Sequence, residues 1–379
     1  MVRTVLTVIL AFFLTISSVP AGNAAEKERT VREVSEAQQA QVREQAEELT
    51  VHFLDVGQGD CTLITCKGAA MLIDAGDDGQ GTRVQKYLME QGVRSLDYVV
   101  CTHFDADHIG GMDVILYKFD CDRIFMTDGE SDTDAYRDLA AVMEDRAYER
   151  TLPAAGEQYE LGDAVFTIVG PARSHDDDNN NSVALLLTHG ENTFLFTGDA
   201  GEEEERDIAK GDLSVLADVY KVGHHGSRTS TSGDLLEKIS PAYAVISCGA
   251  DNAYGHPHQE TLDKLREMDV QVFRTDEQGT ILAVSDGEKI TWNCSPSDTW
   301  KTGEPGESGR PGQTADEEGE AASPENAAIT YVCNRNTGKF HNPDCASVSK
   351  ITEKNKLELT VTREEVTDMG YVPCRNCNP

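Results

Sequence analysis

Basic residues are scarce in this chain. Its 379 residues include 33 Lys and Arg against 67 Asp and Glu, which gives a formal net charge of −34. A field of this sign keeps a protein dispersed and repels polyanions at long range, so any contact with nucleic acid must depend on local features. Hydrophobic residues make up a modest 39% of the chain, and Trp occurs only twice. The length still allows one sizeable core and a smaller second module.

Long apolar runs are equally scarce. The one candidate, Val5–Ile16, follows Arg3 and is shorter than the roughly 20 residues of a membrane-spanning helix. Small residues follow between positions 21 and 25, as in an export signal, and no Cys lies nearby to carry a lipid. We expect residues 1–25 to be a signal peptide and the protein to be secreted, with an uncleaved N-terminal membrane anchor as the alternative.

The rest of the chain divides by composition. Residues 26–48 are rich in Glu, Gln, Ala and Arg with little apolar periodicity, which is typical of a polar helix or stalk. Residues 295–328 are rich in Gly, Glu, Pro and Ser and contain almost no large apolar side chain, so we expect a disordered linker there. Residues 49–294 are long enough for a large domain, and residues 329–379 form a small module with four of the ten Cys.

Short β-rich runs alternate with helical spacing throughout residues 49–294. The clearest strand is Leu96–Cys101, and the clearest helices are Asp134–Arg146 and Glu202–Lys210. Strands that arrive in groups with helices between them predict an α/β fold of layered sheets flanked by helices. The Cys residues of this region are scattered, several in apolar runs, so buried free thiols are at least as expected as disulfides.

Four potential metal ligands lie within six residues directly after the strand Leu96–Cys101. They are His103, Asp105, Asp107 and His108. Buried Asp and His at this density are costly unless a cation compensates for their charge and desolvation. Residues at i and i+2 of an extended segment point the same way, and Asp107-His108 then form a turn with Gly110-Gly111 behind it. Imidazole with carboxylate suits zinc, manganese or iron better than calcium.

Similar residues recur where other apolar strands end. Asp74 ends LID in LIDAG, Asp199 ends FLFTGD, and His224-His225 follow KVG. Each is followed within a residue or two by Gly. An Asp at one strand end is more often a turn residue than a ligand, but the recurrence in one chain indicates a metal site on a sheet scaffold.

In this order the motifs resemble those of the metallo-β-lactamase superfamily, whose second motif usually reads His-x-His-x-Asp-His. The Asp at position 105, with DVGQGD (Asp55–Asp60), GHHGS (Gly223–Ser227) and YGHPH (Tyr254–His258), makes residues 49–291 similar to the hydrolase domain of the late competence protein ComEC. The resemblance implies an αβ/βα sandwich that holds two divalent metals, zinc or manganese, at one sheet edge.

The resemblance also implies a role for each matching residue. His103 and Asp105 would hold the first metal, Asp107, His108 and His225 the second, Asp199 would bridge the two, and Asp74 would orient the Asp107–His108 loop from outside the ligand set.

The chain departs from the family at one ligand. The family usually supplies another His between the second motif and Asp199, where this sequence reads DDDNNNS (Asp176–Ser182) with His175 and His189 on either side. Because Asn is a poor ligand, the first metal is expected to bind weakly, to include a water, or to be Mn²⁺ in preference to Zn²⁺.

The implied chemistry follows from the metals. Two cations about 3.5–4 Å apart lower the pKa of a bridging water, and the resulting hydroxide attacks a phosphoryl or carbonyl centre. Asp107 is therefore counted as catalytic as well as a ligand. His224, His256 and His258 would hold a phosphate oxygen or protonate the leaving group, and Ser227 would donate to phosphate. For His256 and His258, a structural Gly-His-Pro turn is the alternative.

The C-terminal module carries two pairs of zinc-type ligands, His341-x3-Cys345 and Cys374-x2-Cys377. A structural zinc held by one His and three thiolates accounts for this pattern in a segment with little core; disulfides, with Cys333 as a fifth candidate, are the alternative. The segment resembles the zinc-binding domain of the Ada DNA-repair protein, with His where that family uses Cys, which implies contact with DNA. Its seven Lys and Arg against six Asp and Glu make no basic patch, so a folded spacer is an equal alternative.

Three functions are compatible with these motifs. The first is an exported phosphodiesterase or nuclease that acts on DNA. The second is hydrolysis of a small ester, lactone or amide, because the same metal pair serves all of these reactions. The third is a non-catalytic DNA- or partner-binding protein with a degraded site, which the completeness of Asp107, His108, Asp199 and His225 argues against.

Overall fold

The computed structural model describes residues 48–303, 329–334, 339–343, 345, 347–351, 353–361, 366 and 371–374. The expected signal peptide, stalk and most of the expected linker lie outside these residues, as does Cys377. The chain divides into two compact units, one that includes residues 48–303 and one that includes the described segments from residue 329 onwards.

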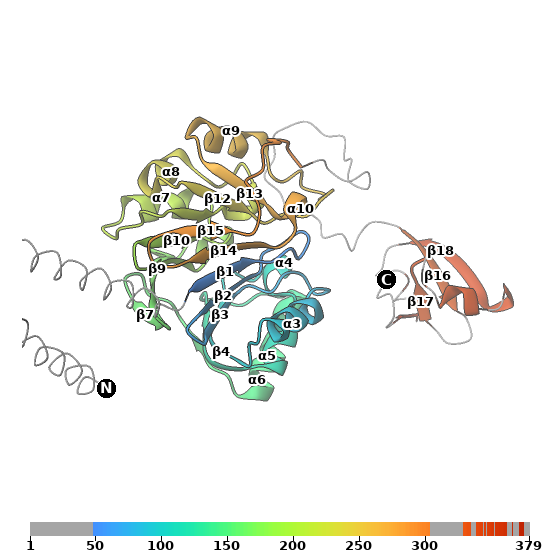
Figure 1. Ribbon diagram of the computed structural model, residues 1–379. Helices are drawn as coiled ribbons and strands as arrows, with labels where there is room; N and C mark the ends of the chain where they lie inside the picture. Colours follow the sequence, from blue (N-terminus) through green and yellow to red (C-terminus); the bar gives the residue numbers. More distant parts are fainter. Residues whose placement is uncertain are drawn as a thin grey trace, which may run out of the picture. The chain divides into compact units, whose positions relative to one another are not determined.

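Eight strands form the first sheet of the larger unit, in the order β15-β14-β1-β2-β3-β4-β5-β6. Strands β3 to β6 are parallel, and the other neighbours are antiparallel. The helices α3, α5 and α6 cover its outer face, where Leu88, Ile115 and Leu139 join one apolar cluster (Figure 1). The elements are β1 (Leu49–Phe53), β2 (Thr62–Cys66), β3 (Ala69–Ile73), α3 (Gly81–Glu90), β4 (Ser95–Cys101), α4 (Ala106–Ile109), α5 (Met112–Lys118), β5 (Asp120–Met126), α6 (Asp134–Arg146), β6 (Arg150–Thr151), β14 (Ile281–Ser285) and β15 (Ile290–Trp292).

Seven strands form the second sheet, in the order β13-β12-β11-β10-β9-β8-β7. Strands β10 to β13 are parallel, and β7 to β10 are antiparallel. The helices α7, α8 and α9 cover the outer face of the parallel strands and bury Ile208, Leu236 and Leu265 in a second cluster. The elements are β7 (Gln158–Leu161), β8 (Ala164–Gly170), β9 (Ala184–His189), β10 (Asn192–Phe196), α7 (Glu202–Lys210), β11 (Val219–Lys221), α8 (Gly233–Ile239), β12 (Tyr243–Ile246), α9 (Gln259–Glu267), β13 (Gln271–Arg274) and α10 (Thr275–Gln278).

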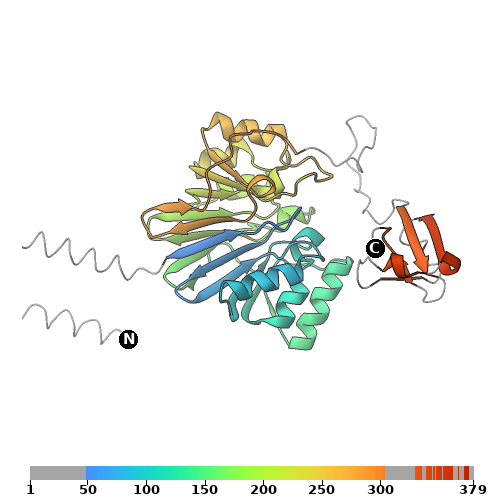
Figure 2. The same ribbon diagram turned by 45° about the vertical axis from the view of Figure 1, so that its right-hand side comes forward.

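The inner faces of the two sheets pack against each other through aromatic rings. Phe53 of the first sheet stacks on Phe196 of the second at 6.2 Å between ring centroids, and Tyr98 meets Phe166 edge-on at 4.9 Å. Fully burying one such side chain contributes about 1.5–3 kcal/mol. Because helices lie outside both sheets, the layers are αβ/βα, which confirms the sandwich predicted from the sequence (Figure 2).

The backbone at the ligand cluster differs from the turn that the sequence suggests. Asp107 and His108 lie in a short helix, α4, and α5 starts soon after it. A Cβ on Gly110 would lie 2.3 Å from the backbone nitrogen of Asp78, and one on Gly111 would lie 2.5 Å from the carbonyl oxygen of Ala75. Because these two glycines lack a Cβ, the loop after β3 can pack directly on α4. The spacing of the ligand residues along the sequence does not reveal this contact.

The smaller unit contains a four-stranded sheet in the order β18-β16-β17-β19. Its core is small and contains Tyr331, Cys333, Phe340 and Val366. Among the residues described in both units, no helix has the length and apolar character needed to cross a membrane. The strands are β16 (Ile329–Asn334), β17 (Lys339–His341), β18 (Lys356–Val361) and β19 (Val372–Pro373).

Candidate metal centre

The candidate ligands meet where strands of both sheets end. His103 follows β4, Asp199 follows β10, and His224-His225 follow β11. The short helix α4, labelled in Figure 1, supplies Asp107 and His108. Residues that are far apart in the sequence thus share the carboxyl ends of strands, where α/β sheets commonly bind their ligands.

One group of donor atoms surrounds a common point. Nε2 of His225 lies 3.3 Å from Nε2 of His108, 3.2 Å from Oδ2 of Asp107 and 3.5 Å from Oδ2 of Asp199. Nε2 of His108 in turn lies 3.2 Å from Oδ1 of Asp199. Donors bound to one cation at about 2.0–2.2 Å have spacings of this size. These are the residues that the family resemblance assigns to the second metal.

A second group shares the carboxylate of Asp199. Nε2 of His103 lies 3.5 Å from Oδ2 of Asp105 and 4.0 Å from Oδ2 of Asp199. Among the described residues, this nitrogen is buried without a hydrogen-bond partner, and the two carboxylates are its near neighbours. Buried polar atoms without partners are costly, and a cation between them removes that cost. The donor set therefore fits divalent metal ions.

Neighbouring groups hold His108 and His225 from behind. Oδ2 of Asp74 lies 2.8 Å from Nδ1 of His108 and accepts a 2.7 Å hydrogen bond from the Thr102 hydroxyl. Oδ1 of Asp74 accepts a 2.9 Å bond from the backbone N–H of Thr102. Nδ1 of His225 lies 3.0 Å from the carbonyl oxygen of Ser247. A partner on Nδ1 fixes the tautomer and leaves Nε2 available for a metal.

The pKa values reflect the concentration of buried carboxylates. Burial alone would lower the pKa of His225, but the carboxylates of Asp199 and Asp60 raise it to about 10. Burial likewise opposes protonation of His108, yet Asp199 and Asp74 hold its pKa well above the ordinary value. Burial would raise the pKa of Asp199, but His108 and His225 hold it well below its usual range. The centre therefore attracts positive charge, whether protons or metal ions.

Two buried residues beside the ligands were not among the candidates from the sequence. Oδ1 of Asp60 lies 3.2 Å from Nδ1 of His225, and Oδ2 accepts a 2.7 Å hydrogen bond from Nζ of Lys221. The Lys221 side chain is only 3% exposed. Burial raises the pKa of Asp60, but Lys221 and then His225 outweigh burial and hold it at about 2. The DVGQGD motif was the available signal for Asp60, whereas nothing in the sequence marks a strand Lys as its buried partner.

The DDDNNNS segment supplies structural hydrogen bonds where the family usually has a ligand. Oδ1 of Asn180 accepts from the backbone N–H groups of Gly201 and Glu204, at 3.1 and 3.2 Å, and so satisfies donors at the start of α7. Oγ of Ser182 accepts a 3.1 Å bond from the backbone N–H of Asp199. The segment thereby helps to position the loop that carries Asp199.

The two histidines on either side of this segment, His175 and His189, interact with residues outside the candidate metal centre. Nε2 of His175 lies 2.7 Å from Oε2 of Glu204, and Nδ1 of His189 lies 2.9 Å from the hydroxyl of Ser285. Burial raises the pKa of Glu204 to about 7, against the opposing hydrogen bonds from Ala172 and His175. Neither histidine is within ion-pairing distance of Asp199, so neither completes the first metal position.

His224 lies beside the carboxylate of Asp199, and the ring of His256 lies near those of His224 and His225. Nε2 of His224 is 3.6 Å from Oδ2 of Asp199. The ring of His256 lies 5.7 Å from that of His224 and 6.1 Å from that of His225. Nδ1 of His256 is buried and has no hydrogen-bond partner within the described residues. Tyr254 stacks on His256 at 5.5 Å with an interplanar angle of 18°, and its side chain is 57% exposed.

His258 and Ser227 hold the surrounding loops. His258 is the residue that precedes α9, and its Nδ1 accepts a 3.0 Å hydrogen bond from the backbone N–H of Arg228. Oγ of Ser227 lies 3.0 Å from Oγ1 of Thr229, and the carbonyl oxygen of Ser227 accepts from the hydroxyl of Thr261 at 2.8 Å. Both residues therefore have structural roles in addition to the catalytic roles expected from the sequence.

The smaller unit brings three of its four expected zinc ligands together. Donor atoms of His341, Cys345 and Cys374 all lie within 4.8 Å of one another. The fourth expected ligand, Cys377, lies outside the described residues. Cys333, the fifth candidate, is a buried free thiol in the core of the unit.

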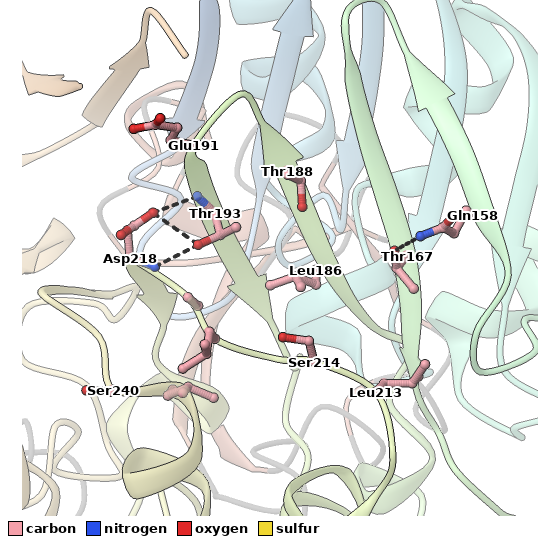
Figure 3. Close-up of a pocket in the computed structure, with 13 residues that line it drawn as sticks. Gln158, Thr167, Leu186, Thr188, Glu191, Thr193, Leu213, Ser214, Asp218 and Ser240 are labelled. Carbon is pink, nitrogen blue, oxygen red and sulfur yellow. Dashed lines mark hydrogen bonds between the residues drawn. The ribbon is translucent and has the colours of Figure 1, made fainter. Parts of the chain in front are cut away.

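A cavity of about 660 Å³ lies on the outer face of the antiparallel part of the second sheet (Figure 3). Thr167, Leu186 and Thr193 line it, and Asp218 accepts hydrogen bonds from the backbone and hydroxyl of Thr193 at 2.8 and 3.0 Å. None of the candidate metal residues lines this cavity. The candidate metal residues therefore lie at the strand ends and not in this cavity.

The comparison with protein families matches residues 54–250 to the metallo-beta-lactamase superfamily. The chain belongs to this superfamily. It is also similar to ComE operon protein 3 of Bacillus subtilis (strain 168), with 31% identity over 251 residues that cover 61% of this chain and 32% of that protein. Competence protein ComA of Neisseria gonorrhoeae is 31% identical over 237 residues, which cover 62% of this chain and 32% of that protein. The chain thus spans about a third of the length of these relatives.

Among solved structures, the metallo-beta-lactamase fold protein YhfI from Bacillus subtilis matches 63% of this chain and all of its own, with a TM-score of 0.43 and 12% identity. The superfamily assignment and the competence relatives confirm the family predicted from the sequence motifs.

Proposed function

We propose that this protein is an exported two-metal phosphodiesterase that cleaves DNA. The observation that carries the proposal is the carboxylate of Asp199, which lies between two groups of donor atoms, one containing His103 and the other His108 and His225. Two adjacent divalent cations supply a water of lowered pKa and the positive charge that a phosphodiester needs during displacement. Zinc and manganese both suit the mixed imidazole and carboxylate donors.

The residues around the ligands favour a phosphate substrate. The ring of His256 lies 5.7 Å from that of His224 and 6.1 Å from that of His225, so it would be close to a phosphate bound at the metals. His258 and Ser227 would help to keep a phosphate oxygen and the leaving group in place, as expected from the sequence. The names of the competence relatives support DNA as the polymer involved.

Tyr254 favours a nucleic acid over a small phosphate ester. Tyr254 is 57% exposed, and its ring stacks on His256, next to the histidines of the metal centre. Stacking of a base on an aromatic ring contributes about 1–3 kcal/mol and needs no long-range attraction. Such local binding is what a chain with a net charge of −34 requires.

The smaller unit would add a structural zinc held by His341, Cys345, Cys374 and Cys377. The clustering of the first three ligands supports this assignment. An Ada-like module of this kind would contact the DNA backbone, and export through a signal at residues 1–25 would place the enzyme where external DNA is met.

A digestion assay on plasmid and single-stranded DNA with Mn²⁺ or Zn²⁺ tests the proposed activity. The variant Asp107→Asn should lose more than about 100-fold in rate, because even residues behind a metal ligand are commonly worth 10–100-fold. Asp163→Asn, which removes an exposed carboxylate that pairs with Lys67, is the matched control and should cleave as the wild type does.

A panel of esters, lactones and amides is assayed under the same conditions. Hydrolysis of these substrates without cleavage of DNA would replace the nuclease with a small-molecule hydrolase. Absence of any metal-dependent hydrolysis would leave a DNA- or partner-binding protein.

A further inference from the structure

The first metal position has fewer ligands than the second. His103, Asp105 and Asp199 point donor atoms towards it, with Nε2 of His103 at 3.5 and 4.0 Å from the two carboxylates. Ser182 is the last residue of the segment in which the family places a further His. Its hydroxyl lies 3.5 Å from Nδ1 of His103, on the other side of the ring from Nε2. The same hydroxyl accepts from the backbone of Asp199. Ser182 is therefore not placed to bind the ion.

His224 approaches the same carboxylate from the second sheet. Its Nε2 lies 3.6 Å from Oδ2 of Asp199, an oxygen that faces Nε2 of both His103 and His225. Donors at about 2.1 Å from a tetrahedral ion are roughly 3.4 Å apart. The 3.6 Å distance from Asp199 to His224 falls near this spacing, and the 4.0 Å distance from Asp199 to His103 is somewhat longer.

The other ring nitrogen of His224 shows the pattern seen in a metal ligand. Nδ1 lies 3.3 Å from Oγ1 of Thr229, which is itself bonded to Ser227. In His108, His225 and His103, Nδ1 is likewise held by a neighbour, respectively Asp74, Ser247 and Thr102. All four imidazoles thus have Nδ1 engaged and Nε2 directed towards Asp199.

The backbone that positions the His224 ring has an unfavourable conformation. His224 and His225 both have left-handed φ angles, 49° and 54°. Two consecutive residues other than Gly in this region cost on the order of 1–3 kcal/mol each, and such strain persists where the surroundings fix it and where function uses it. The backbone N–H of His224 donates to the carbonyl oxygen of Gly198 at 3.2 Å, next to Asp199. This bond ties the strained pair to the loop that carries the bridging carboxylate.

We propose that His224 is a ligand of the first metal and replaces the His that the segment Asp176–Ser182 lacks. The first ion would then be held by Nε2 of His103, Oδ2 of Asp105, Oδ2 of Asp199 and Nε2 of His224. The neighbouring residue, His225, serves the second ion, so one strained histidine pair supplies a ligand to each metal. The assignment rests on the two-metal site of the proposed function but not on its substrate.

Counting bound Mn²⁺ tests this assignment without measuring catalysis. The full-length chain is titrated with Mn²⁺, and free Mn²⁺ is followed by electron paramagnetic resonance; the thiolates of the smaller unit bind this hard ion poorly. The variant is His224→Asn, because Asn accepts a left-handed backbone. Wild type should bind two Mn²⁺, and His224→Asn should bind one, with the other weakened by at least about 10-fold. The ion that remains shows that the site is folded.

Two further variants decide which ion His224 holds. Asp105→Asn should weaken the same ion, and the double variant with His224→Asn should still retain one. His256→Asn, which disturbs a ring packed against His224 and His225, is the matched control and should retain two.

The assignment is overturned if His224→Asn binds two Mn²⁺ with wild-type affinity, if the double variant loses both, or if His256→Asn also loses one. Fewer than two Mn²⁺ in the wild type would overturn the two-metal site itself. Two ions in the wild type without cleavage of DNA would overturn only the proposed substrate.

Discussion

Replacing Lys221 with Met should destabilise the larger unit by about 3–5 kcal/mol, the usual cost of removing one partner from a buried ion pair. The Lys221 side chain is 3% exposed and that of Asp60 is 8% exposed, with 2.7 Å between Nζ and Oδ2. Met fills a similar volume, so the main loss is electrostatic: Oδ2 of Asp60 keeps its charge inside the protein without the ammonium group. Since small domains have a free energy of unfolding of only about 5–15 kcal/mol, this loss is large.

Urea unfolding followed by tryptophan fluorescence measures this effect. The chain has two Trp, Trp292 and Trp300, and both lie in the larger unit, so the signal does not report on the smaller one. Trp292 is partly buried and stacks on Phe273 at 4.0 Å between ring centroids. Measurements are made with a chelator present, because a metal bound to His225 and Asp199 would mask the loss.

The double variant Asp60→Asn with Lys221→Met separates charge from packing. It leaves no buried ion unpaired, so it should be more stable than the sum of the two single changes predicts, by on the order of 1–3 kcal/mol. The interpretation fails if Lys221→Met lies within about 1 kcal/mol of the wild type, or if the two changes are additive.

Two other predictions concern groups away from the candidate metal centre of the larger unit. Glu204→Gln removes a carboxyl group whose pKa rises from 4.5 to about 7 on folding, so the wild type loses stability from this group as pH rises through that range. The variant should therefore exceed the wild type by up to about 3 kcal/mol at pH 8 and match it at pH 4, measured by urea unfolding; a difference independent of pH would contradict the role of burial. Cys345→Ser should lower the zinc content of the full-length chain by one equivalent, measured by mass spectrometry of the metal, while Cys294→Ser, in the larger unit, should leave it unchanged. Equal zinc in all three proteins would refute the structural site.

The fold was largely predictable because its signals are local. Strands such as β4 and helices such as α6 and α7 carry their own periodicity, and ligand-type residues at strand ends indicate sheets with a shared edge. Their order along the chain then gave the family, which the family comparison confirms. The short helix α4 was not predicted, because it depends on the close approach of the loop after β3 to Gly110 and Gly111.

The surroundings of the site were less predictable because they depend on partners far away in the sequence. Lys221 reads as an exposed strand residue until Asp60, 161 positions earlier, is placed beside it. Asn180 reads as part of a polar loop, and only the position of α7 shows that it accepts two backbone hydrogen bonds. Side-chain periodicity cannot separate His224 from His225, which only the family resemblance distinguished, because two left-handed residues in succession follow no regular pattern of side-chain direction.

The pairing of β1 with β14 has a consequence for how this unit combines with other polypeptide segments. Leu49, at the start of the unit, lies opposite Ser285, near its end, so the first strand pairs with the second-to-last strand inside one sheet. A unit whose ends are neighbours can be inserted into or appended to another chain without separating its own elements. The relatives, of which this unit makes up about a third, and the present chain, in which a small unit follows, are two such arrangements. The larger unit can thus be combined with different neighbouring segments. All the residues of its candidate metal centre lie within the unit, so the centre is retained in each combination.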